Sequence, residues 1–278
     1  MIVLRTARVA DEPRLRALWK LAFGDEDAYI DHFFTRYYAP KRMLVLERAG
    51  VVLAMTAWFD MPLVRADGAS LPAAYLYAVA THPDCRGQGL AGKLLDFAGQ
   101  WLAERGFLYL TTVPARPDLH VFFGKNGFSE GFALSGRVYH QPPENTAAIS
   151  LVPVDGEEYG RLREAQLAGR AHVSCSTAAL DYQQGVCALS GGGLYRVGET
   201  GCACVEVSGQ DVFVKELLVS DVPGGVQALA ARHPADCYHV RMPWDGEGER
   251  WDFAMLRPLV PLSEWGESVP AYFGLAFD

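Results

Sequence analysis

A glycine-rich turn between a predicted strand and a predicted helix carries the residues best suited to chemistry. It reads Arg86-Gly87-Gln88-Gly89-Leu90-Ala91 and follows the apolar run 73–81 (AAYLYAVAT). Apolar residues then recur at helical spacing over 90–102, and Gly106 ends the pattern. Glycine lets the backbone approach a ligand closely, and the first amides of a helix favour anions. With the fixed positive charge of Arg86, this turn is predicted to hold a phosphate group.

Two other nucleotide-binding motifs fit the turn less well. A Walker A loop requires Ser or Thr after Gly-Lys, whereas Leu94 stands there. The spacing from Gly87 to Gly92 formally fits the dinucleotide fingerprint. That fingerprint also needs an acidic residue about 20 residues later, and the predicted strand 108–112 (LYLTT) has none.

The turn resembles the acyl-CoA loop of the GNAT (Gcn5-related) N-acetyltransferases, whose pattern is Arg/Gln-x-x-Gly-x-Gly/Ala. Arg86, Gly89 and Ala91 fill this pattern completely. The stretch 122–128 (FFGKNGF) is similar to a second family feature, F-Y-x-K-x-G-F. The resemblance covers residues 1–140 and implies the GNAT fold, an α/β (α+β) architecture with a mixed, mostly antiparallel sheet and flanking helices.

The resemblance also implies a reaction: direct transfer of an acetyl group from acetyl-CoA, the co-substrate, to a primary amine of a small molecule. The strand backbone at Val79, Ala80 and Thr81 is expected to hold the pantetheine arm and polarise the thioester carbonyl. The pyrophosphate is expected to bind the loop residues Arg86, Gly87, Gln88, Gly89, Leu90 and Ala91.

The proton donor for the leaving thiolate is where this chain departs from the family. The family usually has a tyrosine at the second position of F-Y-x-K-x-G-F, and here Phe123 occupies it. Phe123 is expected to contact the coenzyme but has no proton to give. Tyr75 and Tyr77 are the nearest replacements, although tyrosines on a strand are at least as often packing residues. The general base stays open among four residues: His120, His82, Asp60 and Glu47.

Two predicted amphipathic helices precede the sheet and, by the resemblance, roof the acceptor site. The first runs from Asp11 to Gly24, and the second starts at Asp27 and ends before Pro40. Tyr37 and Tyr38, at the end of the second helix, are predicted to line the substrate pocket. Packing in the core is the alternative interpretation of both.

The length of 278 residues favours two domains. We expect a GNAT domain over 1–140, a linker over 141–150 and a shorter, degenerate GNAT-like domain over 151–260. Within these domains the residue patterns predict strands over 128–134, 137–141 and 193–197, and helices over 157–168 and 177–188. In that second part, Asp221 stands where the first loop has its arginine, so no second coenzyme site is expected. The tail 261–278 is expected to pack on the body.

Tandem GNAT folds with one working half occur in several subfamilies, including the Eis-like aminoglycoside acetyltransferases. In those enzymes the C-terminal carboxylate reaches the active site. The carboxylate that ends this chain is therefore one further candidate for the acceptor site.

Composition and net charge limit where the protein is expected to reside and what it is expected to bind. The net charge of −8 argues against a nucleic-acid binder, which needs a basic stripe. The sequence has no run of 18 apolar residues, so no membrane span is predicted, and we expect no signal peptide before the first strand. Six cysteines without a C-x-x-C pair indicate reduced thiols and no metal site. We therefore expect a cytoplasmic protein that binds neither nucleic acid nor a membrane. By the resemblance its partner is a small-molecule amine, and its oligomeric state is open.

Two other functions stay open at this stage. Phe123 and the shortened second half would also suit a non-catalytic acyl-CoA-binding module. A transferase of a different acyl group would keep the same fold with another donor.

Overall fold

The computed structural model describes residues 1–143, 149–260 and 270–277, and the chain divides into two compact units. Among these residues, unit 1 contains Met1–Pro62, Leu71–Glu130 and 255–260. Unit 2 contains Leu63–Ser70, the described part of Gly131–Ala254, and 270–277. No helix among the described residues is long and apolar enough to cross a membrane.

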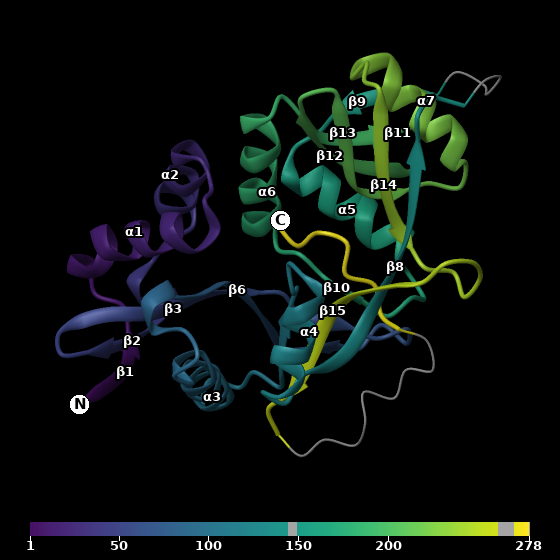
Figure 1. Ribbon diagram of the computed structural model, residues 1–278. Coiled ribbons are helices and arrows are strands. Elements are labelled where there is room, and N and C mark those ends of the chain that lie inside the picture. Colours follow the sequence, from purple (N-terminus) through teal and green to yellow (C-terminus); the bar gives the residue numbers. More distant parts are fainter. Residues whose placement is uncertain (144–148, 261–269, 278) are drawn as a thin grey trace. The chain divides into compact units, whose positions relative to one another are not determined.

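Unit 1 is built on a mixed, mostly antiparallel sheet in the order β1-β2-β3-β6-β7-β15 (Figure 1). The strands are β1 (Ile2–Thr6), β2 (Met43–Arg48), β3 (Val51–Asp60), β6 (Ala73–Thr81), β7 (Tyr109–Thr112) and part of β15 (Trp251–Pro258). Neighbouring strands pair antiparallel except β6 and β7, which run parallel. This is the α/β arrangement expected from the sequence.

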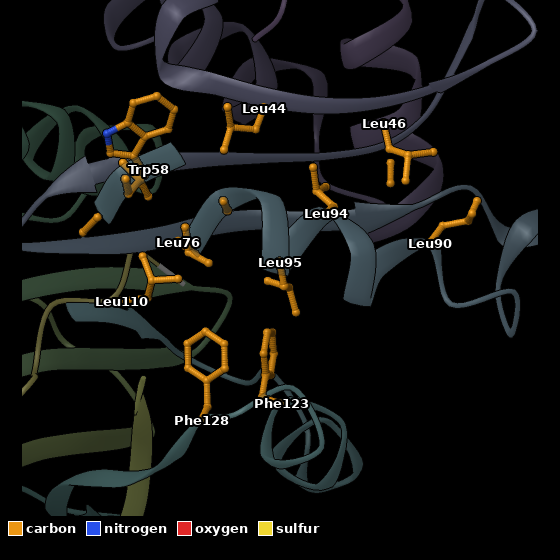
Figure 2. Packing of buried hydrophobic residues seen from close by; sticks show 14 of the residues in the cluster. Leu44, Leu46, Trp58, Leu76, Leu90, Leu94, Leu95, Leu110, Phe123 and Phe128 are labelled. Carbon is orange, nitrogen blue, oxygen red and sulfur yellow. The ribbon is translucent and has the colours of Figure 1, made fainter. Parts of the chain in front are cut away.

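Helices cover both faces of the unit 1 sheet, because successive residues of a buried strand point to opposite sides. On one face lie α3 (Leu90–Ala103) and α4 (Pro117–Gly124), with Leu94 and Leu95 packed against Leu76 of β6 (Figure 2). On the other face lie α1 (Glu12–Phe23) and α2 (Asp27–Arg36), with Trp19 packed against Tyr77 of β6. The two faces of β6 therefore serve two different sets of residues.

The parallel strands β6 and β7 pair over only a short stretch. The pairing runs from Ala73 opposite Tyr109 to Tyr75 opposite Thr111, while β6 continues to Thr81. Ala78 has φ 52, and the register of β6 against β3 shifts at this point, which marks a β-bulge. Within the described chain, β6 beyond Tyr75 therefore has a strand neighbour on one side only.

The main-sheet strands of unit 2 lie in the order β8-β14-β13-β12-β11-β9. The strands are β8 (Ser129–Tyr139), β9 (Leu151–Pro153), β11 (Gly193–Val197), β12 (Gly201–Ser208), β13 (Asp211–Leu218) and β14 (Cys237–Pro243). Its helices are α5 (Gly156–Gln166), α6 (Thr177–Leu189) and α7 (Val222–Arg232). A small additional sheet contains β4 (Leu63–Val64), β5 (Ser70–Leu71) and β10 (His172–Val173).

The two units share one order of elements. Each has a first strand, two helices, three antiparallel strands, a helix and a strand parallel to the preceding one. In unit 1 the last helix and strand are α3 and β7, and in unit 2 they are α7 and β14. The sixth strand of unit 1 is β15, which follows unit 2 elements in the chain, and that of unit 2 is β8, which follows α4. If the chain were divided once, between β8 and β9, β8 would belong to unit 1 and β15 to unit 2. In the structure each of these two strands belongs to the other unit.

One local prediction was wrong, and one strand was not predicted at all. The strands expected over 128–134 and 137–141 form the single strand β8, because Leu134 to Tyr139 pair without a break with Pro243 to Tyr238 of β14. No strand was predicted over β15, which pairs with β7 from Met255 to Pro258.

Residues 144–148 of the expected linker, and 261–269 and 278 of the expected tail, lie outside the described residues. Residues 271–277 are buried in unit 2.

Candidate active site

The glycine-rich turn has the backbone shape that its sequence requires. Gly87 and Gly89 have φ 74 and φ 71, in the left-handed region that residues with a Cβ rarely adopt. A Cβ added at either glycine would meet no atom within 4 Å. The turn is therefore open on the side of both glycines, where a ligand can approach the backbone.

The helix after the turn begins without a side-chain cap. Gly89 is the N-cap of α3, and the amide of Lys93 donates to the Gly89 carbonyl at 3.2 Å. In unit 2 the equivalent helix α7 starts differently, because Asp221 accepts a hydrogen bond from the Gly224 amide at 3.1 Å. The first-turn amides of a helix attract negative charge. The α3 start can thus receive an anion from outside, whereas the α7 start already holds its own carboxylate.

Two arginines lie beside the turn, and the sequence pointed to only one of them. Arg86 Nε donates to the Thr81 carbonyl at 3.3 Å, at the end of β6. Arg48, the last residue of β2, donates from Nη1 to Gln88 Oε1 at 2.8 Å, and its Nη2 lies 3.6 Å from Cys85 Sγ. The partners shown for both guanidinium groups in the described chain are neutral. Arg48 could have been found as a basic residue at the end of a strand that finishes beside the loop.

The end of β6 carries the residues predicted to hold the pantetheine arm. Val79 and Thr81 are half-buried and Ala80 is buried. The His82 amide donates to the Leu53 carbonyl at 2.8 Å, which fixes the strand end against β3. Because the pairing with β7 stops at Tyr75, the opposite edge of this stretch faces no strand in the described chain.

Phe123 lies in the core of unit 1. Its side chain is 4% exposed, and its ring centroid lies 5.4 Å from that of Phe128 and 5.1 Å from that of Phe122. The same apolar cluster contains Leu94 and Leu95 of α3 (Figure 2). A phenyl ring in these surroundings contributes packing and has no acidic proton.

Tyr75 and Tyr77 lie on the other face of β6, in an aromatic cluster with α1 and α2. The Tyr77 hydroxyl shares a hydrogen bond with the hydroxyl of Tyr29, on α2. The Tyr77 ring centroid lies 5.6 Å from that of Trp19 and 5.5 Å from that of Phe59. The Tyr75 ring lies 5.9 Å from that of Tyr77. Tyr29 was not found from the sequence, because only the packing of α2 on the sheet brings it to Tyr77.

Of the two tyrosines predicted for the substrate pocket, one joins this cluster. Tyr37 stacks on Phe59 with ring centroids 3.7 Å apart. Tyr38 packs against Phe34 at 4.9 Å, and its hydroxyl lies 3.5 Å from the Arg8 carbonyl. Burial raises the pKa of Tyr37 and raises the pKa of Tyr38 to about 12. Both hydroxyls are therefore neutral near pH 7.

Three of the four candidates for the general base, His120, Asp60 and Glu47, contact other charged or titratable groups, whereas the buried Nδ1 of His82 has no hydrogen-bond partner in the described chain. His120 Nδ1 lies 2.8 Å from Glu130 Oε1, and no contact shown for the described residues links His120 to the tyrosines. Asp60 pairs with Arg42 at 2.6 Å, and Glu47 pairs with Arg5 at 2.6 Å. His82 Nδ1 lies 3.9 Å from an Asp84 carboxylate oxygen. The structure thus gathers Tyr37, Tyr75 and Tyr77 but not His120.

Comparisons with known proteins agree with this architecture. Residues 3–131 match the family model described as an acetyltransferase (GNAT) domain. A GCN5-related N-acetyltransferase from Anabaena variabilis has a TM-score of 0.72 at 17% identity, over 94% of this chain and 73% of that chain. For Eis1 from Mycobacterium abscessus the TM-score is 0.67 at 14% identity, over 93% of this chain and 74% of that chain.

A probable N-acyltransferase from Enterococcus faecalis has a TM-score of 0.71 at 14% identity, over 93% of this chain and 73% of that chain. No curated protein matches the sequence of this chain. At these identities the solved structures show a shared fold over both units, and the family model adds the class of domain. Residues 3–131 are therefore similar to the acetyltransferase (GNAT) domains, a class that transfers acyl groups from acyl-CoA.

Proposed function

We propose that this chain is an N-acetyltransferase that moves an acetyl group from acetyl-CoA directly to the primary amine of a small molecule. The observation that carries the proposal is the open turn at Gly87 and Gly89 in front of an uncapped helix. The match of residues 3–131 to the GNAT domain model supports an acyl-CoA donor. Acetyl as the acyl group and an amine as the acceptor are the proposed refinement.

In this proposal the loop from Arg86 to Ala91 binds the pyrophosphate through its backbone amides. Arg48 supplies a second positive charge and, through its bond to Gln88, holds the loop in shape. The pantetheine arm lies along the open edge of β6, with the thioester carbonyl directed at the backbone near Val79. The short pairing of β6 with β7 supports this placement, because it leaves that edge without a strand partner in the described chain.

The transfer itself needs one bond made, one bond broken and two proton movements. The ammonium gives one proton to solvent water, its nitrogen attacks the thioester carbonyl carbon, and the carbon–sulfur bond then breaks to release the CoA thiolate. The second proton that the nitrogen sheds as it becomes an amide returns through solvent to the group that protonates the thiolate. We assign the proton for that thiolate to Tyr77, with Tyr29 orienting its hydroxyl. The shared hydrogen bond of these two hydroxyls favours Tyr77 over Tyr75, and Phe123 has no proton to give.

The acceptor is proposed to bind beside the aromatic cluster under α1 and α2, with Tyr37 and Tyr38 at its margin. Aromatic faces attract ammonium groups, which suits a cationic amine before it loses its proton. We further propose that residues 151–260 are a degenerate GNAT-like domain without a coenzyme site. The shared order of elements and the capping of α7 by Asp221 support that assignment.

A turnover assay tests the proposal. Acetyl-CoA is incubated with a panel of small amines, and mass spectrometry follows the acetylated product. Tyr77→Phe is expected to lower kcat about 100-fold, the usual scale for one proton-transfer group, with the dissociation constant for CoA unchanged. Tyr75→Phe is the matched control and should leave kcat within about threefold.

The outcomes separate the proposal from its two alternatives. Binding of acetyl-CoA without product from any amine would favour a non-catalytic acyl-CoA-binding module. Product formed only from other acyl-CoA donors would favour a transferase of a different acyl group. Equal losses in the two tyrosine variants would remove Tyr77 from its proposed role.

A further inference from the structure

An aspartate, a cysteine and a histidine meet on the unit 2 sheet, in residues that the proposed transfer does not use. Asp211 begins β13 and Cys237 begins β14, and the parallel pairing of the two strands sets these residues side by side. His239 follows two residues after Cys237, so its side chain points to the same face. One ligand atom from each residue lies within 4.8 Å of the other two.

Neighbouring groups hold the histidine ring in place. The ring stacks on Phe213 with centroids 4.7 Å apart and an angle of 9°. His239 Nε2 lies 3.9 Å from Asp211 Oδ2. Cys237 is 8% exposed, whereas Asp211 and His239 are half-buried, and Val138, paired with His239 from β8, is 55% exposed. The three ligand atoms are thus ordered by two adjacent strands and can be reached from solvent.

We infer that Asp211, Cys237 and His239 form a binding site for a divalent transition metal, with Zn²⁺ as the best match. A set of one oxygen, one sulfur and one nitrogen suits zinc and its neighbours, whereas Mg²⁺ and Ca²⁺ prefer oxygen ligands alone. Zinc bonds to such ligands are about 2.0–2.3 Å long, which places ligand atoms about 3.5 Å apart in a tetrahedral site. The three side chains need to draw together by about 1 Å, a distance that side-chain rotation covers.

Three protein ligands leave a fourth position for water or another small ligand. The cysteine binds as a thiolate, so its proton leaves when the metal arrives, and affinity should rise with pH. Bound metal would add a link between the starts of β13 and β14, two strands that already pair in the sheet and are connected in the chain through α7. Sequence patterns for zinc sites did not predict this group, because its third ligand, Asp211, comes from a separate strand.

The test uses the full chain, stripped of metal with a chelator and titrated with Co²⁺ as an optical probe, followed by competition with Zn²⁺. We expect one Co²⁺ per chain with a thiolate-to-cobalt absorption band, displaced by Zn²⁺. Cys237→Ser should abolish that band, and His239→Ala should weaken metal binding at least about tenfold. Cys175→Ser changes a cysteine of the same unit that is not part of this group and should leave binding unchanged.

Two results would overturn the inference: no cobalt band in the unchanged chain, or a band that survives Cys237→Ser and His239→Ala together. Circular dichroism of the metal-free variants checks that they fold. Should either variant fail to fold, Asp211→Asn at a half-buried strand start replaces it, and unchanged affinity there would contradict the site. Because acetyl-CoA binding is measured separately, a failure here leaves the proposed transfer reaction untouched.

Discussion

Arg48 is a partly buried cation whose described partners, Gln88 and Cys85, carry no charge. An anion at the start of α3 would supply the missing negative charge. We therefore predict that Arg48→Gln weakens CoA binding by about tenfold or more, since a hydrogen bond to a charged group contributes about 1.5–3 kcal/mol. Calorimetric titration at low and high salt measures the effect, which should shrink as salt screens it.

Arg105→Gln is the matched control for Arg48→Gln. Arg105 follows the other end of α3, where its guanidinium lies 3.4 Å from the ring centroid of Trp101 and donates to the Trp101 carbonyl. Removing this charge should leave CoA affinity within about twofold, because the site is a helix length away. Equal losses in the two variants would mean that net charge, and not the position of Arg48, sets the affinity.

His233, which follows α7, makes stability depend on pH. Its Nε2 lies 2.8 Å from the Tyr195 hydroxyl, and burial, with a smaller effect of Arg232, lowers the pKa of His233 below its ordinary 6.5. The folded chain thus favours the neutral ring, and the unfolded chain takes up the proton first as pH falls below 6.5. The stability from this group is complete above that pH and is lost as pH falls toward the lower, folded pKa.

His233→Gln should therefore flatten the pH dependence of unfolding. Urea unfolding at about pH 7.5 and about pH 5.5 measures the free energy of unfolding of both chains in the window where histidine titrates. The unchanged chain should lose more stability between the two pH values than the variant. Equal losses would contradict the lowered pKa of His233.

Single residues differ in how far the sequence alone could predict them. Gly87, Gly89 and Arg86 carry local signals, namely a left-handed turn, a helix start and a cation within the same motif. Arg48 and Tyr29 reach the site only through contacts with Gln88 and Tyr77, which are 40 and 48 residues away in the chain. No local sequence pattern around Arg48 or Tyr29 predicts such a contact. The loop was predictable for this reason, and its outer partners were not.

At the scale of the element, α3 depends on a glycine at its start. Gly89→Ala places a Cβ on the open side of the turn and forces it to keep φ 71, which costs about 1 kcal/mol or more. We predict this loss of stability together with at least about tenfold weaker binding of CoA, because the methyl group occupies the ligand's approach. Thermal unfolding and calorimetric titration measure the two effects.

Gly106→Ala separates the two effects of that substitution. Gly106 follows the end of α3, has φ 86 and also meets no atom within 4 Å of an added Cβ. The Gly106→Ala variant should lose a similar amount of stability to Gly89→Ala and keep its affinity for CoA. Loss of affinity in both variants would show that strain in α3, and not contact at the turn, weakens binding.

Elements were predictable where one segment carries its own periodicity. The strand over Gly193–Val197 and the helices over 157–168 and 177–188 were predicted close to β11, α5 and α6. The exchange of β8 and β15 was not predictable, because strands with similar hydrophobic patterns do not specify which strands they pair with. The buried ion pair between Arg163 of α5 and Glu216 of β13, 2.9 Å apart, was not predictable either. An amphipathic helix pattern places a charged residue such as Arg163 on the solvent side.

At the scale of the whole molecule, two units with one order of elements differ where a coenzyme would bind. The chain has a net charge of −8, yet the turn before α3 has two arginines beside it, while the start of α7 holds Asp221. Overall charge therefore says little about this site, because a phosphate responds to groups within about a Debye length. A single coenzyme site per chain, in unit 1, is the arrangement that the two helix starts favour.

Calorimetric titration of the full chain with acetyl-CoA, in parallel with CoA, tests this account most directly. We predict one site per chain with micromolar affinity, about −8 kcal/mol, for both ligands. The double variant Arg48→Gln/Gly89→Ala should bind at least about 100-fold more weakly, while Arg105→Gln/Gly106→Ala should bind as the unchanged chain does. Absence of binding by the unchanged chain, or equal binding by both double variants, would contradict the assignment of the coenzyme to the turn between β6 and α3.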